Sequence, residues 1–215
     1  MNIPIIYEDD WLSAVNKPSG LLTIPTPKNE LRTLTSILNE DLKQKGVSWR
    51  LHPCHRLDRE TSGVIIYAKG KAIQKKMMDE FKRKKIRKTY IAFVQGVIPK
   101  NYGEIKESID GQSAITKYKV IQTRKDFTVV EVMPLTGRTN QIRIHFKQIG
   151  HPILGETKYA FRRDFKLKAK RLCLHAKTLE FIHPVTKKHI HLSIDLPEDL
   201  GVFLQKHATK EMRKI

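Results

Sequence analysis

Short apolar runs rich in β-branched and aromatic residues recur along the chain, separated by turn residues or charged segments. Such runs predict β-strands, half-buried where polar and apolar residues alternate and fully buried where the run is continuous. The predicted strands cover residues 4–8, 11–16, 64–68, 90–95, 116–123, 127–133, 179–182 and 189–194. The short connections after residues 123 and 182 predict two antiparallel pairs.

Four further segments are predicted to be helices, at residues 33–45, 72–85, 141–148 and 198–207. The first carries leucine or isoleucine at positions 34, 37, 38 and 42, which form one apolar stripe on a helix. In the second, Ile73, Met77 and Phe81 recur at every fourth position and are expected to face the core.

Many strands with short connections and a few interspersed helices predict an α+β fold, a mostly antiparallel mixed sheet with flanking helices. At roughly 150 residues per domain, a chain of 215 residues forms one domain or one domain with appendages. No repeat, low-complexity tract or linker divides it. We therefore expect a single domain over residues 1–215.

The charge of the chain narrows the class of partner. Lysine and arginine number 41 against 22 acidic residues, a formal net charge of +19 with histidine neutral. Such an excess indicates a polyanionic partner, nucleic acid or an anionic membrane surface. The membrane interpretation is the weaker one, because no run approaches the about 18 apolar residues of a spanning helix.

The N-terminus and the cysteines point to a cytoplasmic protein. Residues 1–10 lack the basic-then-apolar order of a secretory signal peptide. The two cysteines, Cys54 and Cys173, lie far apart and form no C-x-x-C pair, which excludes a disulfide scaffold and a cysteine-rich zinc finger. A reducing, cytosolic compartment is expected.

The first candidate for chemistry is Asp58, within the segment HRLDRETSG at residues 55–63. Arg56 and Arg59 flank it, and cationic neighbours favour the ionised carboxylate. A carboxylate on a loop that precedes a buried strand is suitably placed for a nucleophile or a base. From the residues alone, a surface ion pair beside an ordinary turn is the favoured explanation of the segment.

The second candidate is the segment at residues 135–145, where Arg138 and Arg143 stand five apart. Thr139 or Asn140 is expected to cap the helix that begins near Gln141, whose N-terminus favours an anion. The two arginines can hold a phosphate or a carboxylate such as that of Asp58. The alternative is a basic loop that merely caps the helix.

A third candidate is Tyr90, which follows Arg87 and Lys88 at the start of a predicted strand. A tyrosine beside basic residues suits base stacking, although at a strand start it is more often core filler. The basic run at residues 82–88 is either a solvated face or an RNA contact. No histidine or cysteine set has zinc spacing, and no phosphate-binding glycine motif occurs, so no metal and no nucleotide cofactor are predicted.

Taken together, these segments resemble the RluA family of pseudouridine synthases. Residues 55–63 are similar to its HRLD-x-x-TSG signature, and residues 7–21 to its opening segment. Its later motifs are matched, in family order, by residues 88–96, 135–145, 150–159, 171–176 and 183–184. Two positions depart from the family pattern: Asn140 stands where His is usual, and Glu156 where Asp is usual.

The resemblance implies the pseudouridine synthase fold and isomerisation of uridine to pseudouridine in RNA without a cofactor. It makes Asp58 the catalytic carboxylate and Arg143 the residue that pairs with it. Tyr90 is expected to pack on the uracil and to assist the late proton transfer. Arg56 and Arg138 are implied RNA contacts.

The substrate implied is a loop uridine in tRNA or rRNA, because the base must leave its stack and extrusion is least costly in loops. The chain begins almost at the opening motif, so no S4-type RNA-binding domain is expected, and a monomer is the default. Two alternatives stay open. One is a non-catalytic RNA-binding protein. The other is a hydrolase that releases free uracil, with Glu60 as the second carboxylate.

Overall fold

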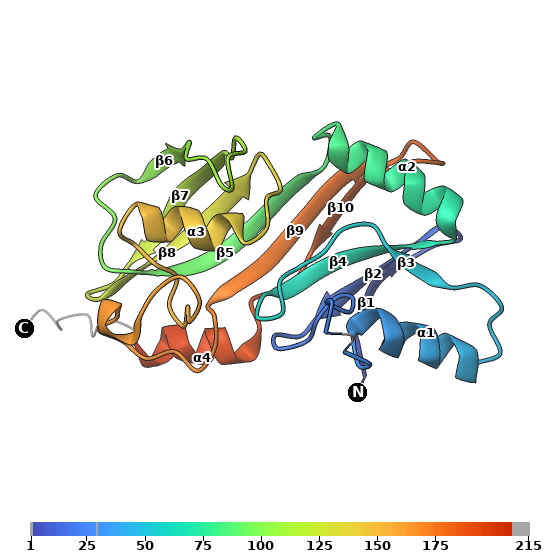
Figure 1. Ribbon diagram of the computed structural model, residues 1–215, viewed down its shortest axis with the longest axis horizontal. Coiled ribbons are helices and arrows are strands. Elements are labelled where there is room, and N and C mark those ends of the chain that lie inside the picture. The colour runs from blue at the N-terminus through green and yellow to red at the C-terminus, as the bar shows by residue number, and fades with distance from the viewer. Residues whose placement is uncertain (1, 29, 208–215) are drawn as a thin grey trace, which may run out of the picture. The chain divides into compact units, whose positions relative to one another are not determined.

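The structure is a computed structural model that describes residues 2–28 and 30–207. These residues form ten strands, four α-helices and one short 3₁₀ helix, η1 (Arg162–Asp164) (Figure 1). The chain divides into two compact units. Of the described residues, unit 1 comprises 2–28, 30–89 and 175–194, and unit 2 comprises 90–174 and 195–207.

Unit 1 is built on a mixed sheet. Its strands are β1 (Ile5–Glu8), β2 (Leu12–Lys17), β3 (Leu51–Pro53), β4 (Ser62–Lys69), β9 (Leu174–Ile182) and β10 (His189–Ser193). They follow the order β1-β2-β4-β9-β10, with β3 paired to the end of β4. The pair β4–β9 is parallel, while every other pair of these strands is antiparallel.

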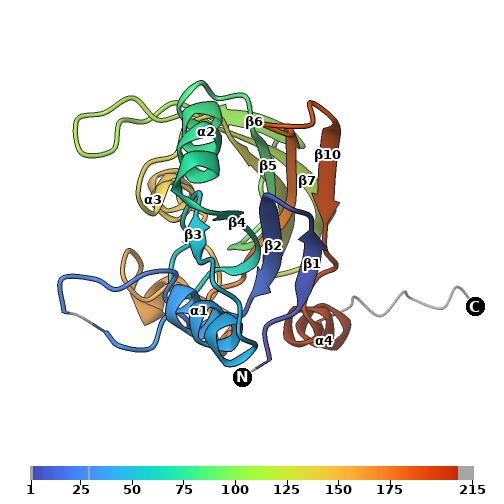
Figure 2. The same ribbon diagram turned by 90° about the vertical axis from the view of Figure 1, so that its right-hand side faces the viewer.

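Two helices cover the same face of this sheet, α1 (Leu34–Gln44) and α2 (Lys71–Lys82) (Figure 2). Thr33 caps α1, because its hydroxyl accepts the amide of Ser36 in a capping box. Leu34 and Leu38 of α1 and Met77 of α2 are buried. The predicted apolar faces of both helices are thus confirmed at these positions.

The prediction of a helix to residue 85 was too long, because α2 ends at Lys82. Lys84 adopts a left-handed conformation with φ of 56°. Its amide donates to Phe81, and the amide of Lys85 donates to Glu80. These two bonds form a Schellman motif, which satisfies the last carbonyls and turns the chain toward the next strand.

Unit 2 has a purely antiparallel sheet in the order β5-β8-β7-β6. The strands are β5 (Arg87–Gln95), β6 (Tyr102–Ile105), β7 (Thr116–Thr123) and β8 (Phe127–Pro134). The helices α3 (Gln141–Gln148) and α4 (Glu198–Lys206) have almost the predicted bounds. Both predicted antiparallel pairs, β7–β8 here and β9–β10 in unit 1, are confirmed.

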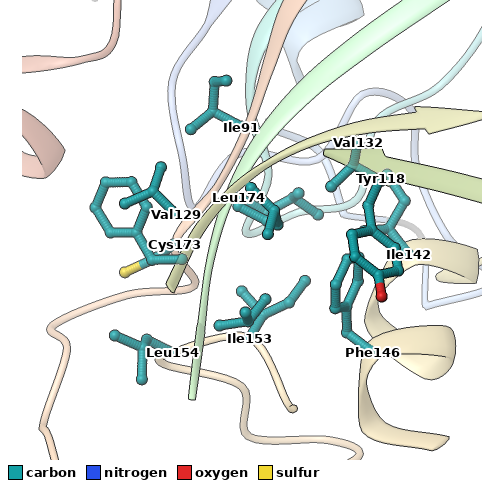
Figure 3. Close-up of a cluster of buried hydrophobic side chains, with 14 of the residues drawn as sticks. Ile91, Tyr118, Val129, Val132, Ile142, Phe146, Ile153, Leu154, Cys173 and Leu174 are labelled. Atoms are coloured by element: carbon teal, nitrogen blue, oxygen red, sulfur yellow. The ribbon is translucent and has the colours of Figure 1, made fainter. Parts of the chain in front are cut away.

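The core of unit 2 lies on both faces of its sheet, because side chains alternate along a strand. Phe93 and Phe127 project to one face, where both rings contact Phe203 of α4. Tyr118 contacts Phe146 of α3 with ring centroids 5.7 Å apart. Figure 3 shows Phe146 and Ile142 of α3 beside Tyr118. Unit 2 therefore fixes α3, which carries the second candidate segment, through packed aromatic side chains.

The predicted α+β class with a mostly antiparallel mixed sheet is confirmed. Two strands were not predicted, β3 and β6, because each has only three or four residues with no clear alternation. Within residues 2–28 and 30–207, no helix has the length and apolar character needed to cross a membrane.

Candidate active site

Asp58 lies in the loop that joins β3 to β4 in unit 1. The loop entrance is tied to β4, because the Cys54 amide donates to the Ile66 carbonyl over 3.0 Å. The Ile66 amide in turn donates to Nε2 of His55 over 3.2 Å. Asp58 itself is half-buried, and its carbonyl accepts the amide of Thr61 in a turn. The carboxylate thus stands on a short turn directly before a buried strand.

Lys17 anchors the loop that carries Asp58. Its side chain is completely buried, although lysine is almost never buried without partners. The ammonium donates to the carbonyl oxygens of Pro18 at 2.9 Å, Leu21 at 2.6 Å and Arg59 at 3.0 Å. A buried charge with several acceptors ties together the chain segments that provide them. Here it joins the end of β2 to the residue after Asp58.

Three neighbours of Lys17 add hydrogen bonds to the same loop. Ser19 donates from its hydroxyl to the Glu60 carbonyl over 2.6 Å, and the Gly20 amide donates to the Arg59 carbonyl over 2.8 Å. The hydroxyl of Thr23 donates to the carbonyl of Leu57 and accepts its amide. The backbone on both sides of Asp58 is therefore fixed by residues 17–23.

The far end of the loop is fixed against β9. Gly63 pairs with Ala176 and has φ of 127°, a region that residues with a side chain rarely adopt. A Cβ atom at Gly63 would collide with the backbone of Ala176. The hydroxyl of Ser62 and Nδ1 of His175 are hydrogen-bonded at 2.9 Å, and both side chains are buried. The TSG part of the signature therefore positions β4 against β9.

The two arginines that flank Asp58 have different surroundings. The guanidinium of Arg59 donates to Glu30 over 3.1 Å at a partly exposed site. Arg56 is exposed, and no ion pair or side-chain hydrogen bond engages it within residues 2–28 and 30–207. The guanidinium of Arg56 is thus available to an external anion, as expected of an RNA contact.

His55 is held in its neutral form. Burial of the ring, with a smaller contribution from the charge of Lys88, lowers its pKa to about 3. The ring packs on Phe81 with centroids 4.8 Å apart, and its Nε2 accepts a backbone amide. The first residue of the signature therefore acts as a hydrogen-bond acceptor that ties the loop to β4.

Arg143 lies on α3 in unit 2 and is almost completely buried. It forms a bidentate ion pair with Glu156: Nε to Oε2 is 2.6 Å and Nη2 to Oε1 is 2.7 Å. Its Nη1 donates to the side-chain oxygen of Asn140 over 2.9 Å. The predicted pairing of Arg143 with Asp58 stays a prediction. The structure adds two residues that orient the guanidinium.

The prediction of a side-chain helix cap by Thr139 or Asn140 is wrong. Asn140 occupies the position before α3, but its backbone is left-handed with φ of 54° and its side chain makes no cap bond. Instead its amide donates to the Tyr159 hydroxyl over 2.8 Å while its oxygen accepts from Arg143. The side chain is thus used to hold Arg143 and is not available to the helix amides.

Glu156 stays ionised in this site. Burial alone raises its pKa, but the hydrogen bond from Arg143, the amides of Lys158 and Tyr159 and the charge of Arg143 outweigh it and lower the pKa. Asn140 and Glu156, the two departures from the family pattern, both contact Arg143. The departures are therefore neighbours in space and act on one guanidinium.

The two remaining candidates also belong to unit 2. Tyr90 lies on β5 opposite Val132 and is half-buried against the apolar core of the unit. Arg138 is exposed on the loop before α3, where its Nε donates to the Ser113 carbonyl over 3.2 Å. Its backbone amide donates to the side chain of Gln141. The loop that carries Arg138 is thereby fixed to the first turn of α3.

Sequence reasoning missed the roles of Lys17 and Glu156. Lys17 was only one letter of the opening segment, and its acceptor Arg59 lies 42 residues further along the chain. Glu156 follows Arg143 by 13 residues, with no periodic relation to it. The sequence offered one signal for each residue. Lys17 ends an apolar strand and Glu156 follows a turn that contains two glycines, and a charged residue buried at either place needs a partner.

Comparisons with known proteins identify the family of the chain. The family described as RNA pseudouridylate synthase matches residues 12–148. The dual-specificity RNA pseudouridine synthase RluA of Haemophilus influenzae is 36% identical over 200 residues, covering 86% of this chain and 89% of that protein. The ribosomal large subunit pseudouridine synthase C of Rickettsia felis is 36% identical over 210 residues, covering 90% and 67%.

Among solved structures, human RNA Pseudouridylate Synthase Domain Containing 4 superimposes with a TM-score of 0.78 at 26% identity, covering 94% of this chain and 92% of that chain. The fold expected from the motifs is therefore confirmed. The family match spans most of the chain and includes the Asp58 loop, Tyr90 and Arg143. The chain belongs to the RluA family of RNA pseudouridylate synthases and is a pseudouridine synthase.

Proposed function

We propose that this enzyme isomerises a loop uridine of tRNA or rRNA with Asp58 as its essential carboxylate. The anchoring of the loop is the observation that carries the proposal. Lys17, Ser19, Gly20 and Thr23 bind the backbone from residue 57 to residue 60, so the Asp58 turn is held from both sides. Such preorganisation lets one carboxylate act without rearrangement of its support.

The reaction rearranges bonds within one nucleotide. The N1–C1′ glycosidic bond breaks, the uracil turns within the site, and a C5–C1′ bond forms. The hydrogen of C5 then leaves as a proton, and N1 gains one, so the product is an isomer of the substrate. Asp58 assists as a nucleophile or as a base, and in both roles the same bonds are broken and formed overall and the same protons are exchanged. A rigidly held carboxylate suits either role.

The other candidate residues are assigned by the resemblance. Tyr90 packs on the uracil and assists the proton transfer at C5, and Arg143 keeps Asp58 charged. Glu156 and Asn140 orient the Arg143 guanidinium, which agrees with a group that must keep one orientation. Arg56 and Arg138 contact the RNA, in accord with their exposed side chains.

Two features support a structured RNA as the substrate. The net charge of +19 provides backbone attraction that offsets the cost of extruding the base. The relatives named above include a dual-specificity synthase and a synthase of the large ribosomal subunit. Specificity then depends on the loop sequence and shape that the enzyme can contact.

Tritium release from RNA that carries 5-tritiated uridine tests the proposal. Pseudouridine formation leaves the mass unchanged but must expel the hydrogen of C5. Wild type, Asp58→Asn and the control Asp41→Asn are compared on tRNA and rRNA fractions from cells that lack the enzyme. Asp41 is an exposed residue of α1 that pairs with Lys45. We expect release by wild type and by the control, and at least a thousandfold loss in Asp58→Asn at nearly unchanged RNA affinity, since the loss lies in the chemical step.

The same assay separates the alternatives. A hydrolase would release free uracil, which chromatography of the reaction detects directly. A non-catalytic RNA-binding protein would bind both fractions and release no tritium from either. Substantial turnover by Asp58→Asn would show that another group performs the chemistry.

A further inference from the structure

A polar cavity in unit 2 has no part in the reaction described so far. Its volume is about 230 Å³. It lies between the loop that joins β6 to β7 and the loop that leads into α3. The lining residues are Ile109, Asp110, Gln112, Gly137, Arg138 and Thr139.

The first wall is a tight turn. Ile109 and Gln112 exchange both backbone hydrogen bonds, at 3.0 and 2.9 Å. Asp110 and Gly111 between them are left-handed, with φ of 49° and 69°. This pattern of two left-handed residues is the type I′ turn of a two-residue hairpin. It fixes the direction in which Asp110 leaves the backbone.

The second wall is braced against the first by α3. Gln141 accepts the Arg138 amide over 3.0 Å and donates to the Ile115 carbonyl over 2.9 Å. His145, one turn further along α3, holds the Glu107 carbonyl at 3.0 Å. The Nε of Arg138 reaches the Ser113 carbonyl. Figure 1 shows α3 beside β7, from which one of these loops departs. The cavity is therefore bounded by two loops tied to one helix.

Most polar side chains around the cavity are not engaged by other described residues. In the part of the chain that the structure describes, no hydrogen bond or ion pair engages the side chains of Asp110, Gln112 and Thr139. Among the described residues, the Arg138 guanidinium is engaged through Nε, which donates to the Ser113 carbonyl, and the side chain is exposed. Asp110 and Arg138 line the same cavity without forming an ion pair. A carboxylate and a guanidinium that line one cavity suit a ligand that presents donors to the first and acceptors to the second.

The charges select the chemistry of that ligand. A phosphate would pair with Arg138 but would be repelled by Asp110. A neutral planar group can bind both side chains if it presents two donors to the Asp110 carboxylate on one edge and two acceptors to the Arg138 guanidinium on another. Guanine is the RNA base with this pattern, since N1–H and N2–H₂ adjoin on its Watson–Crick edge, and O6 and N7 on its Hoogsteen side. Arginine to O6 and N7 is the commonest specific contact to guanine.

We propose that this cavity binds an unpaired guanine of the RNA substrate, with Asp110 on N1 and N2 and Arg138 on O6 and N7. Single-stranded bases are read in this way on their Watson–Crick and Hoogsteen edges. The inference rests on the proposed function. Because the Arg138 loop runs directly into the helix of Arg143, the guanine read here lies near the target uridine. Asp110 and Arg138 are thus specificity-determining residues.

A stem-loop RNA library with one fixed loop uridine and randomised neighbours tests the proposal. After reaction with wild type, Asp110→Asn or Arg138→Gln, the pseudouridine-containing molecules are sequenced. Wild type is expected to favour guanine at one loop position about tenfold over the other bases. Asp110→Asn is expected to lose that preference, and asparagine tolerates the left-handed backbone at this position. Asp41→Asn is the matched control and keeps the preference.

Base analogues assign each contact in a single preferred stem-loop. Replacing the guanine by inosine removes N2–H₂, and replacing it by 7-deazaguanine removes the N7 acceptor. We expect inosine to slow wild type about tenfold but to leave Asp110→Asn unaffected. The 7-deaza analogue is expected to slow wild type and not Arg138→Gln.

The outcomes separate the two levels of the proposal. Pseudouridine formed without a guanine preference, or a preference that persists in both variants, overturns the cavity assignment and leaves the proposed function intact. Absence of pseudouridine from the library and from both cellular RNA fractions overturns the proposed function, and the cavity assignment with it.

Discussion

Arg143 and Glu156 form a bidentate ion pair whose side chains are 5% and 0% exposed, with both donor–acceptor distances at 2.6 to 2.7 Å. The carboxylate is also capped by the backbone amides of Thr157, Lys158 and Tyr159. Such a pair fixes the direction of the guanidinium and leaves little freedom for either side chain. Removal of either partner deprives the other buried charge of its bidentate counterion.

Glu156→Gln is therefore expected to lower the free energy of unfolding by about 3–5 kcal/mol. Denaturant titration of the purified protein measures the change. Asp41→Asn, which breaks the exposed pair with Lys45, is the control and should cost less than about 0.5 kcal/mol. Equal effects of the two substitutions would contradict a special contribution of the buried pair.

Acid should weaken the contribution of Glu156 to the free energy of unfolding in a defined pH range. Its folded-state pKa lies below the ordinary value of 4.5, so its contribution to stability is present above that value. As the pH falls through the lowered pKa, the unfolded state takes up its proton first and the contribution is lost. The difference in unfolding free energy between wild type and Glu156→Gln should thus narrow only below about pH 4.5.

The lowered pKa of His55 predicts that stability begins to fall at a higher pH than the one at which the contribution of Glu156 is lost. Its pKa falls from 6.5 to about 3 in the folded protein. Between these values the unfolded state binds a proton that the folded state does not, so stability decreases as the pH falls from 6.5 toward 3. His55→Gln keeps an acceptor for the Ile66 amide but does not titrate. The unfolding free energy of this variant should depend less on pH than that of wild type between pH 6.5 and 4.5. His52 and His145, whose pKa values are also lowered, are common to both proteins.

Lys17→Met should reduce both stability and turnover. The substitution keeps an unbranched side chain one atom shorter but removes a donor to three carbonyl groups, one of them on Arg59 beside Asp58. A loss of roughly 3 kcal/mol in unfolding free energy is expected. The kcat should fall by more than KM rises, because the Asp58 loop loses its position. Lys69→Met, which breaks a pair with the half-exposed Glu8, is the control and should leave kcat unchanged.

Two glycine substitutions should have opposite signs. Gly63→Ala places a Cβ atom against the backbone of Ala176 at a left-handed φ, so a loss of more than about 1 kcal/mol is expected. Gly201→Ala lies in α4, where nothing stands within 4 Å of the new Cβ, and should stabilise by about 0.5–1 kcal/mol. Thermal unfolding of both variants provides the comparison, and a neutral Gly63→Ala would refute the close approach of β4 and β9.

The local pattern of the sequence was sufficient for most helices and strands. The bounds predicted for α3 and for the pair β7–β8 are close to those observed, because apolar periodicity and short turns are properties of neighbouring residues. The pairing of β9 with β10 was also predicted, but β9 begins at Leu174, five residues before the predicted start. The helix α2 ran too far in the prediction, since a left-handed lysine at position 84 has no sequence signal of its own. The motifs were sufficient for the family and for the reaction class.

Only the tertiary structure decided which side chains support the candidate residues. Lys17 meets the Arg59 carbonyl across 42 positions, and Ser62 meets His175 across 113. Asn140 was expected to cap a helix, but a left-handed backbone turns its side chain to Arg143 and Tyr159. The partner of a buried charge is set by which strands and loops pack together, and that packing follows from the burial of apolar surface over the whole chain. Residue types along the sequence thus identify what chemistry is present, while the fold determines how each group is held.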